Sequence, residues 1–108
     1  MYKGTIIENS LIDKKILEKI KIERNYQSGS WVLYDVFVNK KQIPELSKNL
    51  ADGPWYIHLW KPGKDDVKVI FRNKIFDIKF SDKSTWAGAL AHGKSLGIPS
   101  EQLDFPIN

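Results

Sequence analysis

The most constraining feature of this chain is a run of alternating apolar residues between positions 67 and 80. The apolar positions are Val67, Val69, Phe71, Phe76, Ile78 and Phe80. Alternation with a period of two is typical of a β-strand with one buried face. A two-residue turn at Asn73-Lys74 places all of these side chains on that face. Because each buried side chain of this kind contributes about 1.5–3 kcal/mol, the pattern predicts a hairpin that anchors the core.

The rest of the chain alternates strand patterns with helix patterns. Strands are predicted at residues 2–8, 20–26, 31–38 and 55–60, and helices at 11–18, from 43 to the Gly53-Pro54 stop, and from Ser84 or Thr85 to Gly97. The predicted order is β-α-β-β-α-β-β-β-α. This order predicts an α+β fold with a single antiparallel or mixed sheet of about six strands and helices on one face. The first elements follow the split β-α-β order of ferredoxin-like folds, an analogy that concerns the fold alone.

The strand at residues 55–60 has two apolar faces. The side chains of Trp55, Ile57 and Leu59 alternate with those of Tyr56, His58 and Trp60. Both sets are largely apolar, which is typical of a central strand. The sequence does not determine which set faces the helices, because a one-residue change of register exchanges the two faces.

Length and composition indicate one domain spanning residues 1–108. Of the 108 residues, 42% are hydrophobic and 12% are aromatic, which is enough for a continuous core. The absence of cysteine excludes disulfide bonds, thiolate metal sites and a cysteine nucleophile. It fits a reducing cytoplasm and is also compatible with export. No apolar run approaches the ~20 residues that span a bilayer, so we expect a soluble protein without membrane contact. The sequence does not determine the oligomeric state.

Residues 88–95 match the phosphate-loop pattern G-x-x-x-x-G-K-[ST], which runs here from Gly88 to Ser95. A phosphate loop needs a strand directly before it and a helix that begins at its lysine. Here the pattern lies inside the last predicted helix, whose amides bond internally and cannot hold a phosphate. We interpret Gly88 and Gly93 as small residues for close packing, and we expect no nucleotide cofactor.

A second pattern resembles that of metal-dependent nucleases, with Asp66 followed after ten residues by Asp77-Ile78-Lys79. In a hairpin that turns at Asn73-Lys74, Lys68 lies opposite Lys79. Asp66 is then about four residues, or roughly 13 Å, from the position that faces Asp77. This distance is too long for shared metal ligands, and neither histidine of the chain has further ligands at a metal-binding spacing. We therefore expect no metal site.

Two residues of the sheet could contact a ligand or take part in catalysis. His58 lies among aromatic residues, where its imidazole could hydrogen-bond a ligand or act as an acid or base. Asp35 interrupts the apolar strand 31–38, so it either reaches solvent or pairs with a base. A pairing of Asp35 with His58 would indicate a small enzyme. We favour a packed sheet histidine and a solvent-facing aspartate, because the sequence shows no positioned partner for either, and we assign no catalytic residue.

The segment 61–83 is the most basic part of the chain, with seven Lys or Arg residues against four Asp residues. Lys68, Arg72 and Lys79, together with nearby rings, could form a platform for single-stranded nucleic acid. Only two of the seventeen basic residues of the chain are arginine, however. A lysine-rich surface is more typical of solvation than of phosphate recognition.

By elimination, we interpret the chain as a non-catalytic cytoplasmic module that binds another protein or a small ligand, without a metal or cofactor. Its predicted contact surface is the less buried side of the sheet. The residues assigned to this surface are Tyr56, His58, Trp60, Arg72 and Asp35. The alternatives are nucleic-acid binding through segment 61–83 and a small enzyme that uses His58 and Asp35.

Overall fold

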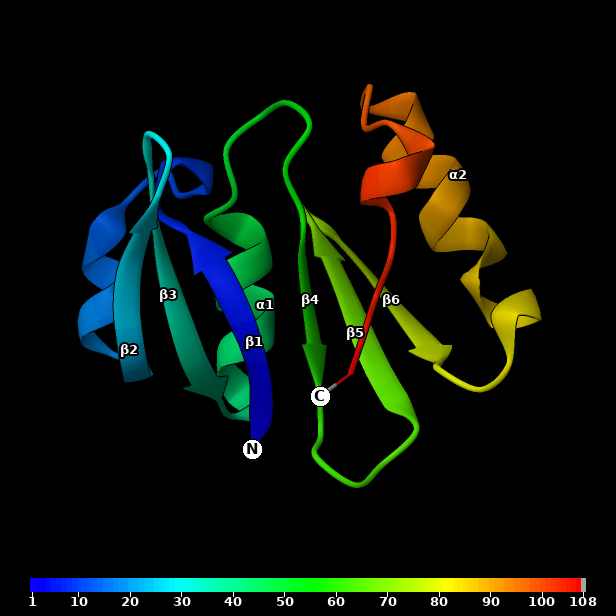
Figure 1. Ribbon diagram of the computed structural model, residues 1–108, viewed down its shortest axis with the longest axis horizontal. Coiled ribbons are helices and arrows are strands. Elements are labelled where there is room, and N and C mark those ends of the chain that lie inside the picture. The colour runs from blue at the N-terminus through cyan, green and yellow to red at the C-terminus, as the bar shows by residue number, and fades with distance from the viewer. Residues whose placement is uncertain (108) are drawn as a thin grey trace.

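A single antiparallel sheet forms the frame of the protein (Figure 1). The computed structural model describes residues 1–107 and arranges six strands in the order β2-β3-β1-β4-β5-β6. The strands are β1 (Tyr2–Ile7), β2 (Lys21–Ser28), β3 (Trp31–Val38), β4 (Ile57–Trp60), β5 (Asp66–Phe71) and β6 (Lys74–Lys79). The helices are α1 (Ile43–Lys48) and α2 (Ala87–Ser95), and 3₁₀ turns lie at Glu8–Ser10, Lys14–Glu18, Lys40–Gln42, Lys83–Trp86 and Ser100–Gln102. The predicted α+β class and single six-stranded antiparallel sheet are confirmed.

The two faces of the sheet are covered by different elements, so the prediction that the helices lie on one face is wrong. We call the face that packs on α1 the back face, and the face that packs on α2 and the C-terminal segment 100–107 the front face. The back core includes Ile6, Val36, Leu46, Leu50, Ile57 and Leu59. The front core includes Trp60, Val69, Phe71, Trp86, Ala89 and Phe105. The physical reason is the two-sided apolar character of β4, which requires cover on both faces.

The predicted helix at residues 11–18 is a short 3₁₀ turn at Lys14–Glu18. Leu11 instead forms an isolated β-bridge with Leu50, and Ile12 is 57% exposed. Asp13 caps the turn by accepting a hydrogen bond from the backbone N–H of Lys15. The chain therefore enters the turn in extended form, and the bridge from Leu11 to Leu50 takes the place of the first turn of the predicted helix.

The β5–β6 hairpin has the predicted buried face but a different turn. Phe71 pairs with Lys74, so the turn lies at Arg72-Asn73, one residue before the predicted position. Asn73 has a φ of 56°, and asparagine tolerates this left-handed conformation better than most residues do. The partner of every β5 residue thereby shifts by two positions, which leaves each side chain on its predicted face. Phe80 is the exception, because it lies beyond β6 and is 37% exposed.

Helix α2 contains the residues that match the phosphate-loop pattern. A Cβ atom at Gly88 would lie 3.0 Å from the ring of Phe76, and one at Gly93 would lie 2.6 Å from the side chain of Leu103. These glycines therefore allow α2 to approach β6 and the C-terminal segment closely. None of the helices in the described part of the chain is long and apolar enough to cross a membrane.

Candidate functional site

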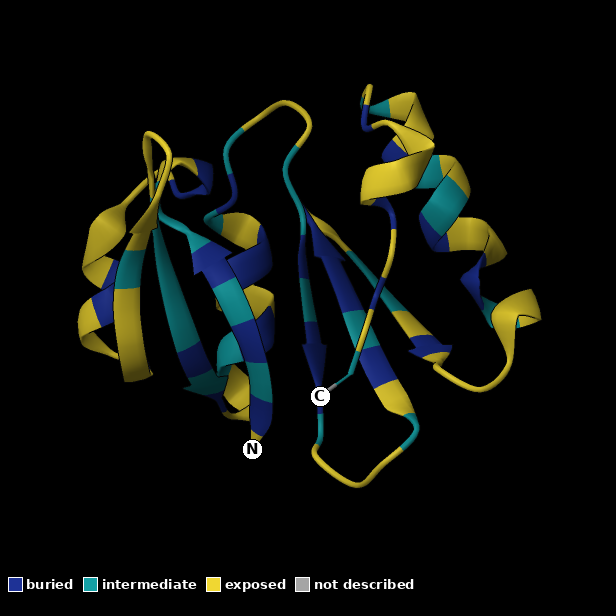
Figure 2. Ribbon diagram, in the orientation of Figure 1, coloured by how far each residue is buried: buried dark blue, intermediate teal, exposed yellow. Residues whose placement is uncertain are grey.

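The front face of the sheet is covered unevenly. Helix α2 and the C-terminal segment lie over β4, β5 and β6, whereas no helix of residues 1–107 lies in front of β1, β2 and β3 (Figures 1 and 2). Every residue of β2 is exposed or only partly buried, and β3 is half-buried along most of its length. We call the front of β1, β2 and β3, together with the adjoining edge of β4, the open face.

The strand register arranges the side chains of the open face in rows. In one row, Leu33 of β3 lies between Tyr26 of β2 and Ile7 of β1. In the next row, Asp35 lies between Arg24 and Thr5. The open face therefore places an apolar row directly beside a polar row.

An apolar hollow of about 260 Å³ lies at the end of the open face where the β2–β3 turn and the loop before β4 meet. Its lining residues are Thr5, Ile7, Trp31, Leu33, Pro54, Trp55, Tyr56, Ile57, His58 and Gln102. The ring centroids of Trp31 and Trp55 are 5.8 Å apart at an interplanar angle of 58°. Trp31 is nevertheless 43% exposed. The hollow thus has an aromatic wall that water still reaches.

A second, polar hollow of about 230 Å³ adjoins the first, and both are lined by Thr5. Its other lining residues are Lys3, Gly4, Arg24, Tyr26, Asp35 and Trp60. Asp35 accepts hydrogen bonds from Thr5 Oγ1 at 2.8 Å and from Arg24 Nε at 2.6 Å. The guanidinium carbon of Arg24 lies 4.6 Å from the centroid of the Tyr26 ring. Arg24 is thus held between a carboxylate and an aromatic face, an arrangement that fixes its direction.

The electrostatics of the polar hollow favour an ionised Asp35. Partial burial pushes the pKa of Asp35 up, but hydrogen bonds from Arg24 and Thr5 outweigh burial and hold the pKa below its ordinary value. The hydrogen bond to Asp35 likewise raises the pKa of Arg24. The hollow therefore holds a fixed ion pair at neutral pH.

The C-terminal segment covers much of the surface predicted around Tyr56, His58 and Trp60. The hydroxyl of Tyr56 donates a hydrogen bond to the carbonyl of Gln102, and His58 Nε2 donates to the carbonyl of Pro106 at 2.9 Å. The His58 and Trp60 rings stack with centroids 5.3 Å apart. Tyr56 and His58 hold the segment against the sheet through these hydrogen bonds, and all three side chains border the two hollows from one side.

Burial changes the proton affinities of the residues beneath this segment. Burial lowers the pKa of His58, and the hydrogen bond to Pro106 opposes it. Burial also raises the pKa of Tyr56 to about 12, and the nearby Asp104 carboxylate adds to this effect. A carbonyl can only accept a hydrogen bond, so the neutral His58 carries its proton on Nε2.

The proposed pairing of Asp35 with His58 does not form. Both residues lie on the open face, but the Asp35 carboxylate is occupied by Thr5 and Arg24, and the imidazole donates to Pro106. Within residues 1–107, no group of three His, Cys, Asp or Glu residues could hold a metal ion. The arrangement can therefore bind a ligand, but it does not assemble an acid–base pair.

Arg72 lies apart from the other predicted contact residues. It follows the front-facing Phe71 and points to the back face, where it donates to the carbonyl of Leu50 at 2.8 Å. Its Nε also lies 3.1 Å from a carboxylate oxygen of Asp52. Arg72 ties the loop after α1 to the β5–β6 turn and does not contribute to the open face.

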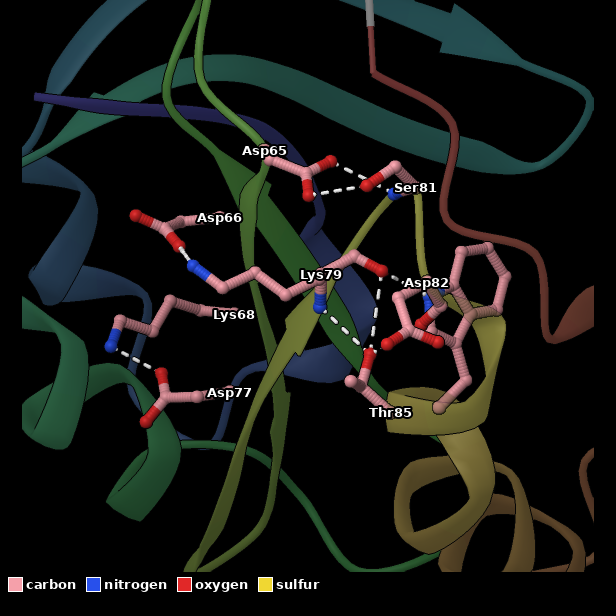
Figure 3. A network of polar contacts seen from close by, with 9 residues as sticks. Asp65, Asp66, Lys68, Asp77, Lys79, Ser81, Asp82 and Thr85 are labelled. Carbon is pink, nitrogen blue, oxygen red and sulfur yellow. Dashed lines mark hydrogen bonds and ion pairs between the residues drawn. The ribbon is translucent and has the colours of Figure 1, made fainter.

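The basic residues of the nucleic-acid alternative form ion pairs across the β5–β6 hairpin (Figure 3). Lys68 pairs with Asp77, and Lys79 pairs with Asp66. Their strand positions alternate with front-core residues, so these pairs lie on the back face, opposite the rings of Tyr56 and Trp60. The predicted platform of lysines and rings is therefore not assembled on one face.

The observed register also corrects the reason for rejecting a nuclease site. Asp66 faces Lys79, and Asp77 faces Lys68, so the two carboxylates are only two strand positions apart. The expected separation of four positions was wrong because the turn lies at Arg72-Asn73. Each carboxylate is instead bound to a lysine ammonium, and no third carboxylate or histidine joins them within the described residues.

Sequence reasoning missed several residues of the open face, notably Thr5, Arg24 and Trp31. A usable signal existed for Arg24. A two-residue turn at Gly29-Ser30 pairs Ser28 with Trp31 and, four residues further along the strand, Arg24 with Asp35, as observed. No local sequence pattern indicated the contribution of Thr5. This contribution depends on the pairing of β1 with the second edge of β3, which places Thr5 opposite Asp35.

Comparison with known proteins finds no family model, no curated protein and no solved structure that matches this chain.

Proposed function

We propose that this protein is a non-catalytic binding module whose open face holds a short segment of a partner protein. The observation that carries the proposal is the apolar hollow bounded by Trp31 and Trp55, on the half of the front face over which no helix of residues 1–107 lies. An apolar side chain of the partner, the anchor, would occupy this hollow. This proposal moves the predicted contact surface from β4 toward β3 and β1, with Tyr56 and His58 at its border.

The size and lining of the hollow support a protein segment as the ligand. A volume of about 260 Å³ is below the 300–1,000 Å³ typical of small-molecule sites, and it suits one large apolar side chain. Its lining includes Trp and Tyr, and the adjoining polar hollow contains an Arg; these residue types are enriched at the energetic centres of protein interfaces. Exposed apolar surface rimmed by polar groups is also typical of interaction sites.

Charge supports a protein partner over nucleic acid. The basic residues of the open face, Lys3, Lys21 and Arg24, are accompanied by the acids Glu23 and Asp35. A nearly balanced face gives little of the counterion release that drives nucleic-acid binding. Single-stranded nucleic acid is therefore the second candidate, supported only by the exposed rings.

Two further interpretations accompany this proposal. The strand order β2-β3-β1-β4, all antiparallel, supports a ferredoxin-like start of the fold, which carries no function by itself. The cysteine-free composition supports a reducing compartment such as the cytoplasm. Fluorescence microscopy of the tagged chain tests the second interpretation.

The test is to pan a displayed library of random dodecapeptides against the whole chain. We expect the selected peptides to share one large apolar residue. We expect Trp31→Ala to weaken their binding by at least about tenfold, as is typical for a tryptophan at an interface centre. Phe80→Ala is the matched control, because Phe80 is a similarly exposed ring that lies outside the open face, and it should leave affinity unchanged.

Two results would overturn the proposal. One is a set of selected peptides that binds Trp31→Ala as tightly as the wild type. The other is binding of an oligo-dT or oligo-U strand that depends on Trp31 and weakens steeply with salt, which would establish the nucleic-acid candidate instead.

A further inference from the structure

We propose that the open face selects partner segments that carry an Asp or Glu side chain two positions from the apolar anchor, and that Arg24 binds this carboxylate. The inference rests on the proposed function and specifies its ligand. It follows from the adjacency of the apolar and polar hollows and from the way in which Arg24 is held.

Arg24 is already oriented for an anion. Its Nε–H donates to Asp35 at 2.6 Å, and its guanidinium lies over the Tyr26 ring. The side chain of Arg24 is nevertheless 67% exposed. The hydrogen bond to Asp35 leaves the terminal amino groups as the remaining donors, and a planar fork of this kind matches a carboxylate. Because the fork is fixed before binding, little side-chain entropy is lost when a carboxylate arrives.

The spacing of the two hollows sets the spacing of the motif. Leu33, in the apolar hollow, and Asp35, in the polar hollow, are two residues apart on β3. Two residues of a strand span about 6.7 Å. A partner segment lying extended along β3 also presents every second side chain to the same face at this spacing. An anchor in the apolar hollow therefore places the side chain two positions away beside Arg24.

The charges that line the polar hollow favour one carboxylate. The lining includes two basic side chains, Lys3 and Arg24, and one acid, Asp35, while Glu23 lies 4.0 Å from Lys3 and is not part of the lining. A phosphate would bring nearly two negative charges next to the ionised Asp35. A basic side chain of the partner would face the charges of Lys3 and Arg24, while Asp35 already accepts hydrogen bonds from Thr5 and Arg24.

The experiment measures affinities of peptides from the same selection. The probes are one selected peptide, its acid-to-amide variant, its phosphoserine variant and its anchor-to-Ala variant. They are titrated against the wild type, Arg24→Gln, Arg24→Lys and the matched control Lys19→Gln. Lys19 has a similarly exposed side chain (68%) and pairs with Glu45 on the back side of the molecule, so its loss removes the same charge away from the site.

We expect the acid-to-amide change to weaken binding to the wild type about fivefold to tenfold, and binding to Arg24→Gln less than about twofold. Arg24→Lys should retain only part of the preference for the acidic peptide over its amide variant, and Lys19→Gln should retain all of this preference. The thermal unfolding midpoint of every variant is measured as a control that it is folded.

The inference is overturned if the selection enriches no acid at this spacing, if the acid-to-amide change costs the same in the wild type and Arg24→Gln, or if phosphoserine binds more tightly than the carboxylate. In each of these cases, the proposed function still stands if the anchor-to-Ala peptide binds the wild type poorly and if Trp31→Ala binds the selected peptide poorly. If neither the anchor-to-Ala change nor Trp31→Ala weakens binding, the proposed function fails as well.

Discussion

Glycine at position 4 is required by its neighbours on β4. A Cβ atom there would lie 2.5 Å from a methyl carbon of Leu59 and 2.7 Å from the carbonyl oxygen of His58. Leu59 is completely buried, and the carbonyl belongs to the strand backbone, so neither can move away easily. Because β1 and β4 are adjacent in the centre of the sheet, Gly4 controls how closely the open half of the sheet approaches the covered half.

We predict that Gly4→Ala lowers the free energy of unfolding by about 1–3 kcal/mol, because the added methyl group overpacks a filled site. Urea unfolding followed by circular dichroism measures the change. The neighbouring Lys3→Ala is the control, and we expect it to change stability by less than about 0.5 kcal/mol. Equal stability of Gly4→Ala and the wild type would show that the β1–β4 contact is looser than described.

His58 gives the protein an acid-sensitive contribution to stability. Burial lowers its pKa in the folded chain below the ordinary value of 6.5. As the pH falls below 6.5, the unfolded chain therefore takes up a proton before the folded chain does, and the free energy of unfolding decreases. The contribution is fully present above pH 6.5 and is lost on acidification.

We predict that His58→Gln removes this part of the pH dependence, since glutamine is uncharged and can still donate to the Pro106 carbonyl. The measurement is the unfolding free energy of both proteins as a function of pH between neutrality and mild acid. The wild type should lose stability more steeply than His58→Gln on the acid side. Parallel curves would show that His58 titrates as it does in the unfolded chain.

Among the elements, the C-terminal segment contributes two buried side chains, Leu103 and Phe105, to the front core. Phe105 is completely buried and contacts the rings of Trp86 and Tyr56, with centroids at 5.0 and 5.7 Å. Leu103 fills the space that Gly93 leaves on α2. This segment therefore covers the front of β4 and β5, whereas no element of residues 1–107 covers the front of β2 and β3 in this way.

We predict that Phe105→Ala lowers the free energy of unfolding by about 3–5 kcal/mol, as is usual for a buried phenylalanine. Denaturant unfolding measures the loss, and binding of a dye such as ANS reports the apolar surface of β4 and β5 that becomes exposed. Gln102→Ala changes an exposed side chain of the same segment and should have little effect. A loss no larger than that of Gln102→Ala would contradict the described packing.

The elements differ in how well the sequence predicted them. The faces of the β5–β6 hairpin were predictable because a shift of two positions leaves every side chain on its face, but for the same reason the pattern could not locate the turn at Arg72-Asn73. The prediction of a helix at 11–18 was wrong. Leu11 forms a bridge with Leu50, and no local pattern reveals a contact between residues so far apart in the sequence.

The candidate site was predicted in part. Tyr56, His58, Trp60 and Asp35 do share the front face, and Tyr56 and His58 border the apolar hollow. The sequence could not show that the C-terminal segment covers much of β4, nor that Arg72 points to the back. Those facts depend on which strand and which segment lie beside β4, and this is decided by packing of the whole chain.

At the scale of the whole molecule, the surrounding elements cover the two faces of the sheet to different extents. The back face is packed by α1 and the 3₁₀ turn at Lys14–Glu18, whereas within residues 1–107 the front face has α2 and the C-terminal segment over one half. The open face carries an exposed tryptophan, an aromatic hollow and an oriented arginine. The protein-binding account explains why these groups lie together on a surface that folding alone leaves exposed.

An NMR titration of the isotope-labelled chain with a selected peptide tests this account most directly. The account predicts that the indole N–H signals of Trp31 and Trp55 and the amides of β1 and β3 shift, while the indole signal of Trp86 and the amides of β6 stay in place. Shifts confined to α2, β6 or the back face, with Trp31 and Trp55 unaffected, would contradict it.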